Sequence, residues 1–230
     1  MRDVDAGLEI LLLRRNSHAV FAPDMYVFPG GRVDASDSDP SVLRRLDDLT
    51  PDAAARRLDL HDADPPAIAY YLAACREAFE ETGILVGSRP DGSPIPTAAS
   101  STPVERIRDD LMENRIEFSA VLDRMDCRIP GDSLRYFAHW ITPRREPRRF
   151  DARFFAARVH EGSAPIVDPR EMTDARWITP AAALAEHLSG DLPMIAPTAH
   201  TVERLSAHSG TADALHTLSL ERVVTILPGG

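Results

Sequence analysis

Three glutamates near the middle of the sequence carry side chains suited to metal chemistry. Glu77, Glu80 and Glu81 occupy positions i, i+3 and i+4, so on a helix their carboxylates project from nearly one face. Like charges at that spacing repel each other and cost helix stability. The arrangement makes physical sense if a hard divalent cation lies among them, because Mg²⁺ takes oxygen ligands. The alternative interpretation is a solvated acidic face with Arg76 as a neighbour.

The residues around these glutamates resemble the Nudix box, usually written G-x5-E-x7-R-E-U-x-E-E-x-G-U, where U is aliphatic. Residues 76–84 match its second half without a gap. Its first half maps onto Gly31, with Asp37 where the first glutamate is expected. The resemblance implies a metal-dependent hydrolase that cleaves a diphosphate bond. Glu77, Glu80 and Glu81 would then bind Mg²⁺ or Mn²⁺, and the sequence does not choose between the two metals.

The resemblance also implies roles for residues outside the three glutamates. Arg76 would orient the carboxylates, and Asp37 would support Arg76 although its side chain is shorter than the usual glutamate. The backbone carbonyl of Gly30 would be a further metal ligand. Many Nudix enzymes add an acidic residue from a loop before a late strand that contains tryptophan. Glu171, six residues before Trp177, fits that place as a ligand or general base, and a plain surface glutamate is the alternative.

The length of the box narrows the resemblance to one branch. Gly31 and Arg76 enclose 44 residues where the pattern has 13, so 31 residues are inserted. A long insertion is a feature of the peroxisomal-type acyl-CoA diphosphatases and their bacterial relatives, which segments 137–143, 148–155 and 196–198 also resemble. This implies hydrolysis of coenzyme A or acyl-CoA to 3′,5′-ADP and a phosphopantetheine product. Two alternatives stay open: another nucleoside diphosphate derivative, such as a dinucleotide or nucleotide sugar, and a catalytically silent domain that senses a nucleotide.

An arginine-rich stretch offers positive charge for substrate phosphates. Guanidinium groups form bidentate contacts with phosphate, and coenzyme A carries a 3′-phosphate that ordinary nucleotides lack. We predict that Arg148, Arg149 and Arg153 bind the substrate, whereas Arg144 and Arg145 fit a solvated turn better.

Bulk composition sets the class of protein. The chain has 230 residues, 43% of them hydrophobic and 27% charged, which suits a soluble single domain, residues 1–230. A net charge of −10 argues against a nucleic-acid scaffold but not against a small anionic substrate, because a cation can reverse the local field. Cys75 and Cys127 are expected to be reduced. The longest apolar run near the N-terminus, residues 10–13, is too short for a membrane span, so we expect a cytoplasmic protein, and a homodimer stays open.

The hydrophobic pattern predicts an α+β fold, the Nudix α/β/α sandwich with a mixed sheet. A long helix should begin after an N-cap at Asp64, with Pro65 and Pro66 in its first turn, and end at Thr82 before Gly83. Strands and helices are expected over the following segments: strands 8–14, 26–28, 134–141, 150–159 and 176–178, and helices 102–113, 118–125, 180–188 and from Thr198 or His200 to 207. A turn over 143–147 should join two of the strands.

Two segments are predicted to be additions to this fold. Residues 38–66 form a helical insertion whose leucines make an apolar face that needs covering, so it should shape substrate access or a subunit contact. Residues 179–230 form a C-terminal helical extension. Nudix folds usually begin with a strand before the one at 8–14, and residues 1–6 are too short and polar to supply it. We therefore expect either that the natural start lies upstream or that a partner chain covers this edge.

Overall fold

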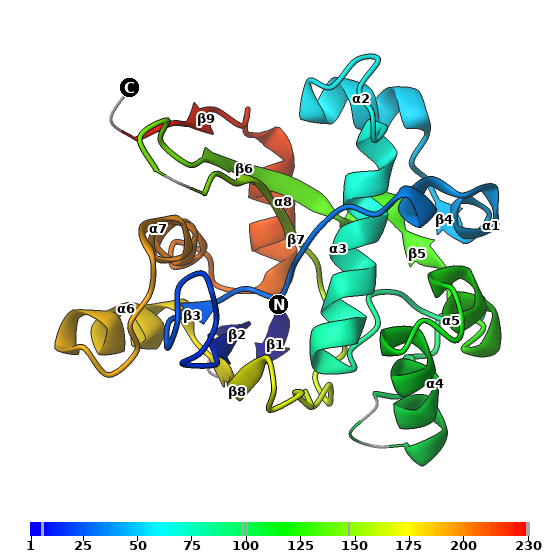
Figure 1. Ribbon diagram of the computed structural model, residues 1–230, viewed down its shortest axis with the longest axis horizontal. Coiled ribbons are helices and arrows are strands. Elements are labelled where there is room, and N and C mark those ends of the chain that lie inside the picture. Colours follow the sequence, from blue (N-terminus) through cyan, green and yellow to red (C-terminus); the bar gives the residue numbers. More distant parts are fainter. Residues whose placement is uncertain (6, 98, 100, 147, 229–230) are drawn as a thin grey trace.

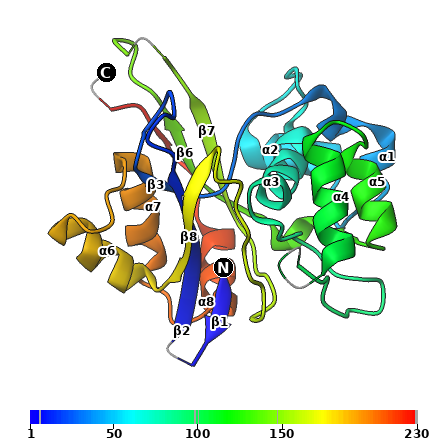
Figure 2. The same ribbon diagram turned by 60° about the horizontal axis from the view of Figure 1, so that its bottom comes forward.

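The strands lie between two layers of helices, as Figures 1 and 2 show. The computed structural model describes residues 1–5, 7–97, 99, 101–146 and 148–228. One layer contains α3 (Ala67–Thr82), α4 (Thr102–Met112) and α5 (Phe118–Arg124), and the other contains α6 (Pro180–Ser189), α7 (Ala196–Leu205) and α8 (Thr211–Leu220). The predicted α+β sandwich is therefore confirmed.

The strands divide among separate sheets rather than forming one continuous sheet. In the first sheet, β2 (Gly7–Arg15) pairs antiparallel with β1 (Arg2–Val4), β3 (Tyr26–Val27) and β8 (Met172–Ile178). In the second, β6 (Arg135–Ile141) lies between antiparallel β7 (Asp151–Ala156) and parallel β9 (Thr225–Ile226). A small parallel pair joins β4 (Leu46–Asp47) to β5 (Ile129–Pro130). Ile10, Leu12 and Leu13 of β2 are at most 1% exposed, which explains its unbroken apolar sequence.

Helix α3 has the apolar stripe that the sequence predicted. Tyr71, Leu72, Cys75 and Phe79 are fully buried, at the 3- to 4-residue spacing of one helix face. Gly83 ends the helix in the left-handed conformation, with φ of 68°. The predicted start was wrong by two residues: α3 begins at Ala67, and its N-cap is Pro66, which is extended, rather than Asp64. A residue that precedes a proline is sterically disfavoured in the helical conformation. Asp64 and Pro65 both precede a proline, so the helix begins only after them.

The insertion is helical in part and is covered by its own chain. It contains the short helices α1 (Pro40–Leu43) and α2 (Pro51–Leu58), and Thr50 caps α2 because its Oγ1 accepts from Ala53 N at 3.2 Å. Its buried apolar side chains join the same core as α3: Val42, Leu49, Ala54 and Leu58. The apolar face therefore needs no second subunit to cover it.

Several boundaries differ from the predicted ones. Strand β7 ends at Ala156 rather than at 159, β8 begins earlier, at Met172, and α7 begins at Ala196 with Pro197 in its first turn. In the predicted turn between β6 and β7, Pro147 lies outside the described residues. Cys75 and Cys127 are free and buried, as expected. Across the described residues, no helix has both the length and the apolar character that crossing a bilayer requires.

The first residues of the chain form a strand, contrary to the sequence prediction. Strand β1 pairs with residues 7–9 of β2, and its Asp3 side chain accepts hydrogen bonds from Thr211 N at 2.7 Å and Thr211 Oγ1 at 2.6 Å. Asp3 thereby satisfies a free N–H at the start of α8, a helix that lies in the predicted C-terminal helical extension but whose bounds were not predicted. Both elements depend on this contact between distant segments, so local patterns did not reveal them.

We predict that Asp3→Ala lowers the free energy of unfolding by about 1 kcal/mol, because the first turn of α8 loses its cap. For a chain of this size that corresponds to a fall in Tm of roughly 2–4 °C. Asp5→Ala is the control and should stay within about 0.5 kcal/mol, because Asp5 is exposed. Urea denaturation followed by circular dichroism gives both values, and equal stability of the two variants would contradict the capping role.

Candidate active site

The three glutamates lie on the last turns of α3, beside the strands. Side chains of Glu77 and Glu80 are 15% and 23% exposed, so they are partly withdrawn from solvent without being sealed in the core. The opposite face of the helix is the buried stripe that contains Phe79. Packing of that stripe therefore fixes the direction in which the carboxylates point.

Arg76 is the hub of the site. Its Nε and Nη2 donate to the two carboxylate oxygens of Asp37 at 2.8 and 3.0 Å, which is a bidentate ion pair. Its Nη1 donates to Glu77 Oε1 at 3.0 Å and to Glu80 Oε2 at 2.9 Å. A further bond from Nη2 reaches the carbonyl oxygen of Arg32 at 2.7 Å. The predicted support of Arg76 by Asp37 is present, and one guanidinium positions two of the three glutamates.

Gly30 and Gly31, which follow β3, place their own backbone against these carboxylates. A Cβ atom at Gly31 would overlap the carboxylate of Glu77, so any other residue here would displace that carboxylate from its place beside Arg76. The N–H of Gly30 donates to Glu81 Oε2 at 2.8 Å. Asp37, whose side chain is fully buried, follows in the short 3₁₀ helix η1 (Ala35–Ser38). The inserted residues begin after it, so the insertion leaves the geometry of the site unchanged.

The electrostatics of the site favour bound positive charge. Burial raises the pKa of Glu80 to about 7 and that of Glu81 to about 8, and the charge of Glu77 contributes to both shifts. Burial also raises the pKa of Glu77, while the charge of Arg76 opposes this. Burial alone would lower the pKa of Arg76, but its hydrogen bonds with Asp37 raise it. Two carboxylates that ionise reluctantly near neutral pH are sites where a cation would stabilise the charged form.

The oxygen ligands available at this site are of the kind that a hard divalent cation prefers, although they are not already arranged around a metal position. The available ligands are carboxylate and carbonyl oxygens, which suit Mg²⁺ or Mn²⁺. Among the described residues, no three acidic, histidine or cysteine side chains are already spaced to hold a metal ion. Arg76 engages Glu77 and Glu80, and the Gly30 N–H engages Glu81.

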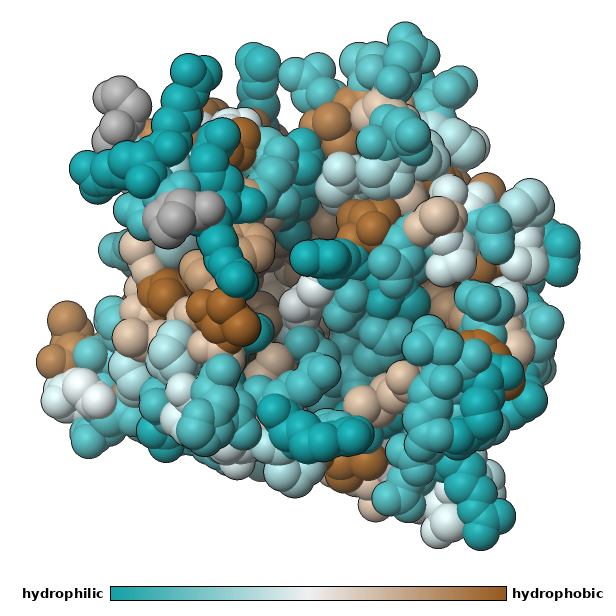
Figure 3. Space-filling model, in the orientation of Figure 1, coloured by the Kyte–Doolittle hydropathy of each residue, from teal (hydrophilic) through white to brown (hydrophobic). Residues whose placement is uncertain are grey.

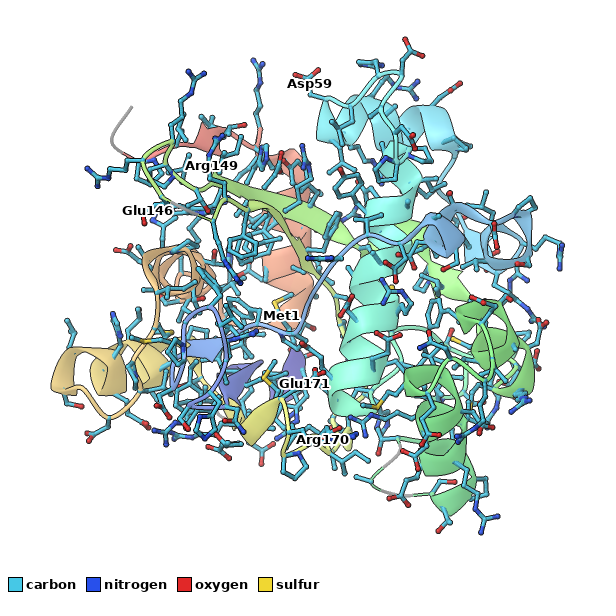
Figure 4. The ribbon with its side chains drawn as sticks, in the orientation of Figure 1. Met1, Asp59, Glu146, Arg149, Arg170 and Glu171 are labelled. Atoms are coloured by element: carbon cyan, nitrogen blue, oxygen red, sulfur yellow. The ribbon has the colours of Figure 1, made fainter. Side chains whose placement is uncertain are left out.

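Glu171 lies close enough to α3 to influence Glu81. Its charge contributes to the raised pKa of Glu81. Glu171 comes directly before β8, its carbonyl accepts from Asn16 N at 2.9 Å, and Figure 4 shows it beside α3. Its neighbour Arg170 is bound to Asp168 and is 85% exposed. This placement agrees with the predicted position of Glu171 in a loop before a late strand, and its role as ligand or base stays a prediction.

Two arginines near the site were missed by the sequence analysis. Arg15, the last residue of β2, lowers the pKa of Glu81 through its charge. Arg108 of α4 is 5% exposed, and its Nε donates to the carbonyl oxygen of Glu80 at 2.8 Å, at the end of α3 where carbonyls lack helical partners. Neither stands in a recognisable motif, so only the folded chain reveals them.

The structure separates the three arginines that were predicted to bind substrate. Arg148 and Arg149 are exposed at the tip of the β6–β7 hairpin, and Figure 4 shows Arg149 there, away from Glu171 and α3. The Arg153 side chain is only 6% exposed, and its guanidinium lies 4.9 Å from the ring centroid of Tyr70 on α3. Tyr70 and Glu77 are two helical turns apart on one face, about 10 Å along the axis. Arg153 therefore faces the same side of α3 as Glu77.

His139 of β6 is a buried histidine whose two ring nitrogens both have partners. His139 is 7% exposed, and its two ring nitrogens lie 2.8 Å from Thr225 Oγ1 and 2.7 Å from Asp151 Oδ1. Because Asp151 also pairs with Arg153, the histidine belongs to the network that fixes this arginine.

The surface is hollowed between the strands and α3. Figure 3 shows this hollow near the centre of the molecule, with hydrophobic residues on the wall around β3 and hydrophilic residues on the wall formed by α3. A cleft with one charged wall and one apolar wall suits a substrate that has both a polyanionic and an apolar part.

Solved and characterised proteins share this architecture. The crystal structure of a NUDIX hydrolase from Alicyclobacillus acidocaldarius superposes with a TM-score of 0.73 at 27% sequence identity, covering 96% of this chain and 93% of that chain. Acyl-coenzyme A diphosphatase NUDT19 of Homo sapiens is 28% identical over 246 residues, and that of Xenopus laevis is 26% identical over 242. The alignments cover 95% and 93% of this chain but 65% and 63% of those relatives, so the chain spans less than two thirds of their length.

The fold and the carboxylate helix thus place the molecule in the Nudix class. Within that class, the family model of the NUDT19 Nudix domain matches residues 3–205, and the chain belongs to this family. The match runs through the insertion and through α6 and α7, in agreement with the branch that the long box indicated.

The Arg76–Asp37 pair gives a stability prediction with a matched control. Asp37→Asn removes a buried charge that compensates Arg76, so we expect a loss of about 3–5 kcal/mol in the free energy of unfolding. Asp34 also lies near Arg76, at 3.5 Å from Nη2, but its side chain is 59% exposed. Asp34→Asn should cost no more than about 1 kcal/mol. Chemical denaturation of both variants measures the difference, and a loss below about 1 kcal/mol for Asp37→Asn would contradict the structural role.

Proposed function

We propose that this chain is a metal-dependent Nudix hydrolase that cleaves the diphosphate bond of coenzyme A or acyl-CoA, giving 3′,5′-ADP and phosphopantetheine or its acyl ester. The observation that carries the proposal is the joint presence of the family match and of three glutamates at the end of α3, of which Arg76 holds Glu77 and Glu80 and the Gly30 N–H holds Glu81. Relatives named acyl-coenzyme A diphosphatase support the substrate class.

Glu77, Glu80 and Glu81 are the residues that would hold Mg²⁺ or Mn²⁺, with the carbonyl of Gly30 as a further ligand. The bound metal would supply charge neutralisation on the phosphoryl oxygens and a water of lowered pKa. The role of Arg76 is to hold Glu77 and Glu80 in place, through bonds of 3.0 and 2.9 Å. Glu171 is positioned near Glu81 to be an additional ligand or to accept the proton of the attacking water.

Arg153 is the best placed of the three candidate arginines to contact a substrate phosphate. It faces the same side of α3 as Glu77, and its Nε is buried with no hydrogen-bond partner among the described residues. A buried donor without a partner costs about 1–3 kcal/mol, which a phosphate oxygen would remove. Arg148 and Arg149 would reach the substrate only from the exposed end of the hairpin.

We predict that Glu81→Gln and Glu77→Gln each lower kcat by at least about 100-fold at saturating metal, because each removes a charged metal ligand. The fold should stay intact, as circular dichroism and Tm would show. Mn²⁺ affinity, measured by calorimetry on the same variants, should fall in parallel. Glu105→Gln, at an exposed position on α4, is the control and should leave both values unchanged. Normal kcat and Mn²⁺ affinity in both site variants would exclude the metal assignment.

We predict that Arg153→Lys lowers kcat/KM on coenzyme A by about ten- to a hundredfold, because one ammonium cannot replace a bidentate guanidinium. The loss should be larger on coenzyme A than on dephospho-coenzyme A if Arg153 contacts the 3′-phosphate. Arg148→Ala is the comparison and should have the smaller effect. Steady-state kinetics on both substrates decide the point, and equal losses on the two substrates would exclude the 3′-phosphate contact.

A further inference from the structure

Two phenylalanines form an exposed pair on the surface. The rings of Phe21 and Phe150 lie 4.5 Å apart between centroids, and the residues are 38% and 42% exposed. Val20, next in the chain, is 72% exposed. We call Val20, Phe21 and Phe150 the aromatic rim. Contiguous apolar surface of this kind is unfavourable in water and marks a binding surface more often than isolated apolar residues do.

The aromatic rim is continuous with the proposed active site. Phe154 lies four residues after Phe150, on the same face of the extended chain, and its ring contacts Phe28 edge to face at 6.2 Å between centroids. Phe28 is two residues before Gly30, whose N–H holds Glu81. Phe28 and Phe154 therefore connect the segment that holds Glu81 with the strand that follows Phe150 of the rim.

The backbone on both sides of the aromatic rim is tied down. Arg15 Nε donates to the carbonyl oxygen of Phe21 at 2.9 Å, and Phe150 N donates to Thr142 Oγ1 at 3.0 Å. Arg15 is also the cation whose charge acts on Glu81. The backbone that carries the two rings is thus bonded to β2 through Arg15 and to the residue after β6 through Thr142.

We propose that the aromatic rim binds the acyl chain of an acyl-CoA whose diphosphate lies at the three glutamates. The inference rests on the proposed function and deepens it, because it selects the acyl ester over free coenzyme A. The occupant must join a polyanion to a flexible apolar chain, since a charged wall and an apolar wall border the same hollow. Methylene groups of the chain would gain burial on the two rings, at about 0.8 kcal/mol for each fully buried CH₂.

The test compares kcat/KM for free coenzyme A and for octanoyl-CoA in the wild type and in the variants Phe21→Ala and Phe150→Ala. The wild type should prefer the ester, and each variant should lose about tenfold more on the ester than on coenzyme A, mainly through KM. Phe21→Leu keeps apolar surface and should restore most of the preference. Leu188→Ala is the matched control, because Leu188 is 87% exposed on α6 and lies outside the rim.

Three results would overturn the inference. Equal losses on the two substrates would assign the rings a structural role. A fall in oligomer size in the variants, seen by light scattering with unchanged substrate preference, would assign the rim to a second copy of the chain. A wild type that hydrolyses coenzyme A without preference for the ester would exclude acyl binding and leave the proposed function standing. A wild type inactive on both would contradict the proposed function itself.

Discussion

The bidentate ion pair between Arg76 and Asp37 is the interaction on which the site depends. A buried guanidinium is unfavourable unless its donors are matched, and here Asp37, two glutamates and the carbonyl of Arg32 match them. The same contacts set the orientation of Glu77 and Glu80 relative to Gly30 and Gly31. Stability and site geometry are therefore consequences of one network, and both require that Asp37 and Arg76 meet although 39 residues separate them in sequence.

This requirement constrains the insertion. The 31 extra residues leave the site after Asp37 and return at the start of α3, and their apolar side chains pack on the far side of that helix in the shared core. The insertion thus supports the helix that carries the glutamates without adding to its charged face. Arg108 of α4 also supports this helix, because its Nε donates to the carbonyl oxygen of Glu80 near the helix end, where carbonyls lack helical partners.

The sequence predicted the parts of the fold that are encoded locally. The apolar stripe of α3, its end at Gly83 and the buried strand β2 follow from periodicity and from one glycine. The start of α3 was predicted too early because two prolines act before the helix rather than inside it. Strand β1 was missed, and α8 was predicted only as part of a helical extension without bounds. The two elements meet through the bond between Asp3 and Thr211, 208 positions apart, and no local pattern records such a contact.

The residues of the candidate site also fall into two groups: those that the sequence predicted and those that only the folded chain reveals. The resemblance of residues 76–84 to the second half of the Nudix box identified the glutamates and Arg76, and the match of its first half to Gly31 implied the pairing with Asp37. Arg15 and Arg108 lie beside the site only because β2 and α4 pack there. Among the hairpin arginines, position along the hairpin decides which one faces α3, because Arg153 lies within β7 whereas Arg148 and Arg149 precede the strand and are exposed. The arginine-rich composition alone could not separate them.

The most direct test of the account is to identify the products of the purified protein by mass spectrometry. Coenzyme A, octanoyl-CoA, a dinucleotide and a nucleotide sugar would each be incubated with Mg²⁺, with Mn²⁺ and with a chelator. We predict 3′,5′-ADP together with phosphopantetheine or its octanoyl ester, formed only when a divalent metal is present. Cleavage of only the dinucleotide or nucleotide sugar, or release of 3′,5′-ADP at the full rate in the chelator, would contradict it.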